Sequence, residues 1–154
     1  MNGKIIGIGL LACAVIAGGG MWYLQEYYFY DRLPPADSIT VQTATGPATL
    51  AVTGFQGIDG NSSPLKWRFC GLLPEQPADP VPFAGPTPTG APGWFDCFDY
   101  ARLTRDLESG AARAVLSQAE IRPDVDRVLA IYPDGRAFGW HQYNDKTPER
   151  GVMD

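Results

Sequence analysis

The sequence of 154 residues predicts an α+β protein: an N-terminal transmembrane helix followed by a small domain with an antiparallel sheet, a short helical pair and a proline-rich loop. Three observations predict this fold. Residues 5–25 contain no charged residue, apolar residues alternate with polar ones in several short runs, and residues 74–92 hold seven of the fourteen prolines. The chain then divides into an anchor with its helical extension at 1–30, a domain at 31–143 and a polar tail at 144–154.

The uncharged run at residues 5–25 is the expected membrane span. At a rise of about 1.5 Å per residue, it covers the roughly 30 Å hydrocarbon core of a bilayer. Trp22 and Tyr23 lie at its end, as is typical of the aromatic belt at a membrane interface. Lys4 precedes the span and Glu26 follows it, so the positive-inside rule predicts a cytoplasmic N-terminus and a domain outside the cytoplasm.

Three alternatives to an uncleaved anchor remain. A cleaved signal peptide has an apolar core of about 7–15 residues and a small-residue exit, and the apolar run here continues beyond the best match to such a site. A lipoprotein is the second alternative, because residues 10–13 (LLAC) resemble a lipobox with Cys13 as the lipidated residue. A buried core helix is the third, although the uncharged run and its aromatic end favour a membrane span.

Small residues recur along the predicted span. Gly3 and Gly7, and then Ala14 and Gly18, form pairs four residues apart, which is the spacing that lets a second membrane helix approach closely. The alternative is that glycine is common in membrane helices in general. We expect these four residues to form a helix-packing face.

Several short runs in the domain have the two-residue period of half-buried strands. Ile39, Val41 and Thr43 alternate with polar residues, a Gly-Pro turn follows, and residues 48–55 are expected to return as the second strand. Residues 65–70 alternate apolar and basic side chains and predict a third strand.

The proline-rich stretch at 74–92 is expected to be an extended surface loop, because proline lacks the N–H that helices and interior strands require. Val81 and Phe83 are the side chains expected to attach it to the domain.

A helical pair and a hairpin are expected after this loop. Tyr100, Leu103 and Leu107 share one helical face, and Gly110 marks the end of that helix. Residues 111–119 are expected to form the second short helix. Two strand-like runs, 125–132 and 136–143, flank Pro133-Asp134-Gly135, a strong predictor of a hairpin.

Two of the three cysteines, Cys70 and Cys97, lie in the domain. Two thiols outside the cytoplasm favour one disulfide, which would join the base of the proline-rich loop to the preceding strand. The alternative is a redox-active or metal-binding pair. The chain lacks the C-x-x-C spacing that lowers a thiol pKa and lacks a methionine or histidine cluster for copper, so we expect a structural bond and no metal site.

Asp96, Asp99 and His141 are the candidates for acid–base chemistry. The two aspartates lie three residues apart at the start of a helix, where capping is the common role of such residues. His141 lies on a strand without an identifiable nucleophile or orienting acid, so a solvent-facing histidine is expected. No catalytic residues and no cofactor are predicted.

Composition narrows the range of partners. Twelve basic and seventeen acidic residues give a net charge of −5, and the part after residue 25 carries eleven and seventeen, or −6. A chain with this excess of acidic residues lacks the basic surface that nucleic-acid binding requires. No small-molecule substrate is identifiable. Pro92, Trp94 and Phe95 are the best candidates for an exposed contact surface, with core packing as the alternative.

Three short motifs support a family resemblance. Residues 1–4 (MNGK), 92–99 (PGWFDCFD) and 132–138 (YPDGRAF) together resemble an uncharacterised family of small single-pass alphaproteobacterial membrane proteins. The resemblance covers the length of the chain but rests on short motifs. It implies a bacterial inner membrane with the domain in the periplasm, and it implies no particular activity.

The sequence therefore predicts a membrane-anchored periplasmic interaction protein, an accessory subunit or assembly factor of a larger inner-membrane complex, with respiratory complexes among the candidates. The alternative is a periplasmic thiol-redox factor or enzyme that uses Cys70 and Cys97, or Asp96, Asp99 and His141. A periplasmic ligand sensor is a third class, for which residues 1–4 offer no visible output on the cytoplasmic side.

Overall fold

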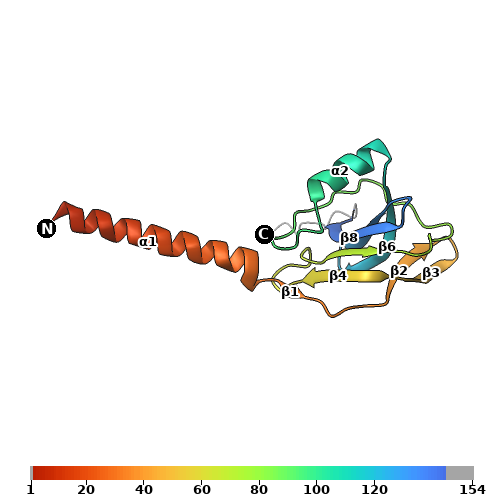
Figure 1. Ribbon diagram of the computed structural model, residues 1–154, viewed down its shortest axis with the longest axis horizontal. Coiled ribbons are helices and arrows are strands. Elements are labelled where there is room, and N and C mark those ends of the chain that lie inside the picture. The colour runs from red at the N-terminus through yellow and green to blue at the C-terminus, as the bar shows by residue number, and fades with distance from the viewer. Residues whose placement is uncertain (1, 145–154) are drawn as a thin grey trace, which may run out of the picture.

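The structure is a computed structural model that describes residues 2–144. Helix α1 (Gly3–Tyr23) continues into a π-helical turn, Leu24–Tyr28, and together they project from a sheet-rich domain as one rod (Figure 1). No residue of either segment is buried. The rod is long and apolar enough to cross a membrane, which agrees with the predicted span.

The domain is built on a six-stranded antiparallel sheet with the strand order β1-β4-β5-β8-β7-β6. In that order the strands are β1 (Asp31–Arg32), β4 (Thr53–Asp59), β5 (Arg68–Leu72), β8 (Arg136–Tyr143), β7 (Val125–Ile131) and β6 (Arg113–Arg122). Strands β2 (Ser38–Thr43) and β3 (Gly46–Ala51) form a separate antiparallel pair. The predicted α+β class is confirmed.

The two faces of the large sheet carry two separate apolar cores, because neighbouring residues of a strand point to opposite faces. On one face, Phe69 and Leu129 pack with Ile39 and Val41 of the β2–β3 pair. On the other face, Trp140 and Val128 pack with residues of α2 and of the proline-rich loop. The sheet is thus the middle of three layers.

Helix α2 (Tyr100–Ser109) forms as expected. Asp99 caps its start by accepting a hydrogen bond from the Arg102 N–H at 3.0 Å, and Gly110 ends it in the left-handed conformation, with φ +79°. Leu103 is the buried residue of the helix. In Figure 1 the helix lies across one face of the large sheet.

The second predicted helix, at 111–119, is wrong. This segment belongs to β6, which pairs with β7 through register partners such as Val115 and Leu129. The spacing of Val115 and Ala119 suggested a helical face, but the strand buries Val115 and Ser117, two residues apart. Pairing with β7 and burial between the layers outweigh the weak helical preference of this run.

The strand predictions hold in part. The hairpin of β7 and β8 forms around the predicted Pro-Asp-Gly turn, and β2 buries the predicted Ile39, Val41 and Thr43. The single strand expected at 48–55 is instead two strands, β3 and β4, which belong to different sheets. Buried Val52 lies between them, and the third predicted strand begins later than expected, at Arg68.

The proline-rich loop begins beside β2, where Pro80 pairs with Thr43, and its later part, from Phe83 onward, packs on the face of the large sheet that also carries α2. We call residues 74–98 the strap. As expected, residues 74–92 form neither a helix nor a long strand. The Val81 N–H donates to the Gln42 carbonyl at 2.8 Å and the Phe83 N–H to the Ala114 carbonyl at 3.0 Å. The Phe83 side chain packs against the core on the α2 side, as predicted, whereas Val81 is held through its backbone. Residues 145–154 of the predicted tail lie outside the described residues.

Candidate functional site

The predicted disulfide between Cys70 and Cys97 is present, with 6.4 Å between the two Cα atoms. Cys70 lies on β5 and is buried, whereas Cys97 lies near the end of the strap and is half-buried. Phe95 and Phe98 flank Cys97 and are buried in the core on the same face of the sheet. The bond therefore attaches the C-terminal end of the strap, which lies immediately before α2, to a central strand of the sheet.

Arg68 attaches the middle of the strap. Its side chain is only 3% exposed, and its guanidinium donates to the carbonyls of Thr89 and Gly90 at 3.0 and 2.8 Å and to the Thr89 hydroxyl. It also donates to the carbonyls of Leu65 and Trp67, at 2.5 and 2.7 Å. Burial lowers the pKa of Arg68 to about 10, so the group remains a cation at neutral pH.

Gln142 on β8 makes a second polar attachment of the strap. Its amide oxygen accepts from the Thr87 N–H and from the Trp140 indole N–H, each at 2.8 Å. Its amide nitrogen donates to the Gly85 carbonyl at 3.1 Å. Arg68 and Gln142 both lie in runs of alternating residues that predict strands. The alternation does not show that the polar ends of these two side chains bind the strap.

The end of the strap contacts the extension of α1. Glu26, in the π-helical turn, accepts a hydrogen bond from the Gly93 N–H on its carboxylate at 2.9 Å, and its carbonyl accepts one from the Trp94 indole N–H. The guanidinium of Arg32 lies 4.6 Å from the centre of the Trp94 ring, and Tyr30 meets that ring edge-on. We call the contacts of Glu26, Tyr30 and Arg32 with Gly93 and Trp94 the junction.

On the side of β5, Lys66 also contacts the extension of α1. Its ammonium group donates to the Phe29 carbonyl at 3.2 Å and lies over the rings of Phe29 and Tyr30, 4.8 and 4.4 Å from their centres. Two separate parts of the domain, the strap and the segment before β5, therefore hold the segment that leaves α1.

The exposed contact surface expected at Pro92, Trp94 and Phe95 needs correction. Pro92 and Phe95 are buried, and Trp94 is half-buried. Trp94 donates to the Glu26 carbonyl, so it contacts the chain's own N-terminal segment. A sequence does not show whether an apolar, aromatic run covers its own chain or a partner.

Asp96, Asp99 and His141 do not come together. Asp96 and Asp99 line a pocket of about 210 Å³ with Arg102 and Arg136, on the face of the sheet that carries α2. His141 points to the opposite face, where its ring stacks on Trp67 with 4.9 Å between ring centres. The structure therefore does not assemble this candidate acid–base set.

The expectation that His141 faces solvent is also wrong, since the residue is only 4% exposed. Its Nδ1 lies 2.8 Å from the Pro64 carbonyl and its Nε2 accepts a hydrogen bond from Arg127 Nε at 3.1 Å, which assigns the ring proton to Nδ1. The pKa of His141 is lowered to about 4, mainly by burial and in smaller part by nearby arginine charges, and the hydrogen bond to Pro64 partly opposes this shift. The ring is neutral at neutral pH.

The small residues of α1 are all exposed. At 3.6 residues per turn, Gly3, Gly7, Ala14 and Gly18 lie within about 60° of one another around the helix. A Cβ atom built at any of the three glycines would meet no other atom of the structure within 4 Å. Nothing in residues 2–144 therefore covers this face.

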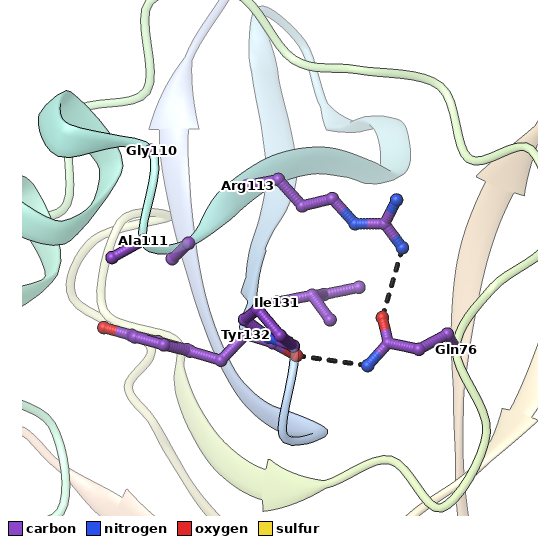
Figure 2. A pocket seen from close by; sticks show the side chains of 8 residues that line it. Gln76, Gly110, Ala111, Arg113, Ile131 and Tyr132 are labelled. Atoms are coloured by element: carbon purple, nitrogen blue, oxygen red, sulfur yellow. Dashed lines mark hydrogen bonds between the residues drawn. The ribbon is translucent and has the colours of Figure 1, made fainter.

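A further pocket, of about 410 Å³, lies where β6 leaves the end of α2. Figure 2 shows Arg113 and Gln76 on one side of it and Ala111 on the other. The sequence reasoning singled out none of these three residues. Within residues 2–144, no group of three or more His, Cys, Asp or Glu side chains is placed to hold a metal ion.

These features define a class of protein: a small α+β domain, crossed by a disulfide-linked strap and joined to one exposed apolar helix. The model of a family of unknown function, DUF6446, matches residues 38–150, and the chain belongs to that family. The match begins at β2, so it leaves out α1 and the short edge strand β1 and covers the strands from β2 onward. No curated protein and no solved structure matches the chain.

Proposed function

We propose that this protein is a single-pass membrane-anchored interaction protein, with a cytoplasmic N-terminus and a periplasmic domain, that serves as an accessory subunit or assembly factor of a larger inner-membrane complex. The observation that carries the proposal is α1, a helix of 21 residues with none buried. A helix satisfies its own backbone hydrogen bonds in lipid, and small side chains on one face allow close approach of a partner helix.

The junction supports this role. The Trp94 indole and the Gly93 N–H both bind Glu26, directly after the apolar span, so the strap fixes the domain next to the end of α1. A domain held in this way keeps a defined orientation relative to a helix packed in a membrane complex. That arrangement suits a subunit that must present one surface at a fixed height above the membrane.

If the host complex is a respiratory one, the acidic domain has a further role there. The part of the chain after residue 25 has eleven basic and seventeen acidic residues. A net charge of −6 next to an electron-transfer complex raises the local concentration of basic soluble cytochromes, an effect that salt screens.

Substitutions on the two sides of α1 test the proposal. Gly7→Leu with Gly18→Leu fills the small-residue face, whereas Gly9→Leu with Gly20→Leu adds the same side chains to the opposite side of the helix. Membranes are solubilised in mild detergent and the complexes are measured by native gel and mass spectrometry. We expect the first double variant to shift from a large assembly to the free chain, and the control to remain assembled.

The result that would overturn the proposal is a wild-type chain that migrates only as a free monomer. Equal assembly of both double variants would contradict the role of the small-residue face. A C-terminal alkaline phosphatase fusion tests the orientation separately, because the enzyme becomes active only in the periplasm. An inactive but intact fusion would contradict the proposed topology.

A further inference from the structure

The pocket of about 410 Å³ beside the end of α2 has the size of a small-ligand site. Its walls are mostly apolar and include Ala111, Ile131 and Pro133. Gly110, whose left-handed φ of +79° favours glycine, turns the chain from α2 into this wall. The lining residues include no Asp or Glu, so the pocket does not favour a cation.

Arg113 supplies the charged group of the pocket and is held in place by Gln76. The Arg113 Nη2 donates to the Gln76 amide oxygen at 3.1 Å, and the Gln76 amide nitrogen donates to the Tyr132 carbonyl at 3.1 Å (Figure 2). The Gln76 amide thus uses both of its ends to orient the guanidinium. This leaves the Arg113 Nε and Nη1 groups for another acceptor.

No carboxylate in residues 2–144 forms an ion pair with Arg113. The Asp106 carboxylate, near the same end of α2, accepts the Tyr132 hydroxyl at 2.6 Å and pairs with Arg102 at 3.6 Å. An oriented guanidinium whose bound partner is a neutral amide is well suited to an external carboxylate, which it can bind through two parallel hydrogen bonds.

We propose that this pocket binds a carboxylate that carries an apolar body. The carboxylate pairs with Arg113, and the apolar body lies against Ala111, Ile131 and Pro133. The charge and the apolar lining of the pocket suit two sources of this chemistry, a free organic acid and the C-terminal carboxylate of a peptide chain with an apolar last residue. The proposal does not depend on the proposed function, because α1 contributes nothing to the pocket.

Calorimetric titration of the full-length protein in nanodiscs tests the proposal with 4-phenylbutyrate and its uncharged amide, 4-phenylbutyramide. We expect the acid to bind at least tenfold more tightly than the amide. Added salt should weaken the binding of the acid and leave the binding of the amide unchanged. Arg113→Gln should reduce the affinity for the acid about tenfold or more, since it removes a charge-assisted contact.

Two further variants separate the parts of the site. Arg105→Gln removes one positive charge from the exposed side of α2 and should leave binding unchanged. Ala111→Phe fills the apolar side of the pocket and should weaken the binding of the acid and of the amide to the same extent. Arg113 is exposed at the start of β6, and an unchanged melting temperature confirms that its variant is folded.

The source of the carboxylate is determined with acetyl-Ala-Phe as the free acid and as the C-terminal amide. Tighter binding of the peptide acid than of 4-phenylbutyrate indicates a chain terminus, and the reverse indicates a free organic acid. The proposal is overturned if neither acid binds, if acids and amides bind equally, or if Arg113→Gln leaves the affinity for the acids unchanged.

Discussion

The strap and the central strands of the sheet are stabilised in different ways. Strands β7 and β8 pair at seven consecutive positions, and β5 and β8 pair at five. The strap pairs with strands at only two isolated positions, Pro80 with Thr43 and Pro82 with Val115. The remainder of the strap is held by side chains of the sheet, among them Arg68, Gln142 and Cys70.

Proline content explains this difference. Seven prolines in residues 74–92 remove seven backbone donors, so this segment cannot form a continuous ladder. Side-chain donors and acceptors from β5 and β8 take over part of that role. Removing one of these side chains should therefore release a defined part of the strap, whereas a defect in the central strands should weaken the whole domain.

Removing the disulfide is expected to have the largest effect. With Cys70→Ala and Cys97→Ala together, loss of a cross-link between residues 27 positions apart should lower the free energy of unfolding by about 3.5 kcal/mol. Urea denaturation of the full-length protein in nanodiscs measures this change. Hydrogen exchange should show faster opening of residues 92–98 than of β7.

Val128→Ala is the matched control in the sheet, since Val128 is fully buried on β7. It should lower global stability without selective opening of the strap. An unchanged stability of the double cysteine variant would contradict the structural role of the bond. Reactive thiols at Cys70 and Cys97 in the native protein, in addition to that of Cys13, would do so as well and would favour the thiol-redox alternative.

Acid should weaken the domain through His141. Its pKa falls from 6.5 in the unfolded chain to about 4 in the fold, so the unfolded state binds the proton first as the pH decreases. The free energy of unfolding should therefore be unaffected by His141 above pH 6.5. It should decrease between pH 6.5 and 4 by on the order of 3 kcal/mol. His141→Gln, which does not titrate, should lack this component of the pH profile, and identical profiles would contradict the assignment.

Much of the fold could be predicted from the sequence because it depends on local patterns. An uncharged run predicted α1, a Pro-Asp-Gly turn between two alternating runs predicted the β7–β8 hairpin, and Asp99 and Gly110 predicted the ends of α2. The helix predicted at 111–119 is wrong because one of the two buried strand positions is the polar Ser117, so the apolar residues do not show a period of two, and pairing with β7 determines the strand.

The contacts of the strap could not be predicted, because they join residues far apart in the chain. Arg68 appeared as a basic residue on the exposed side of a strand, yet it is buried under the strap. The same reason applies outside the strap to His141, one of whose partners, Pro64, lies 77 residues away in the chain. The two cysteines were the exception, since their chemistry pairs them without knowledge of the fold.

Substitution of Arg68 should release the middle of the strap. Arg68→Met keeps the bulk of the side chain but leaves the carbonyls of Thr89 and Gly90 without their donor, which should cost about 2 kcal/mol. Arg68→Lys keeps the charge but not the planar fork and should recover only part of the loss. Denaturation measures the cost, and faster exchange confined to the β7–β8 ladder would contradict the role of Arg68 in the strap.

The smallest effect on stability is expected directly after the strap, where Asp99 caps α2. Asp99→Ala removes the acceptor for the Arg102 N–H and should lower stability by about 1 kcal/mol. Asp99→Asn keeps an acceptor and should lose only the smaller contribution of a negative charge at the helix start. In both variants, hydrogen exchange should be faster in the first turn of α2 and unchanged at the residues that Arg68 contacts. If Asp99→Ala instead loosens residues 85–90, the strap and α2 form one cooperative unit, and the proposed independence of the strap's attachments is wrong.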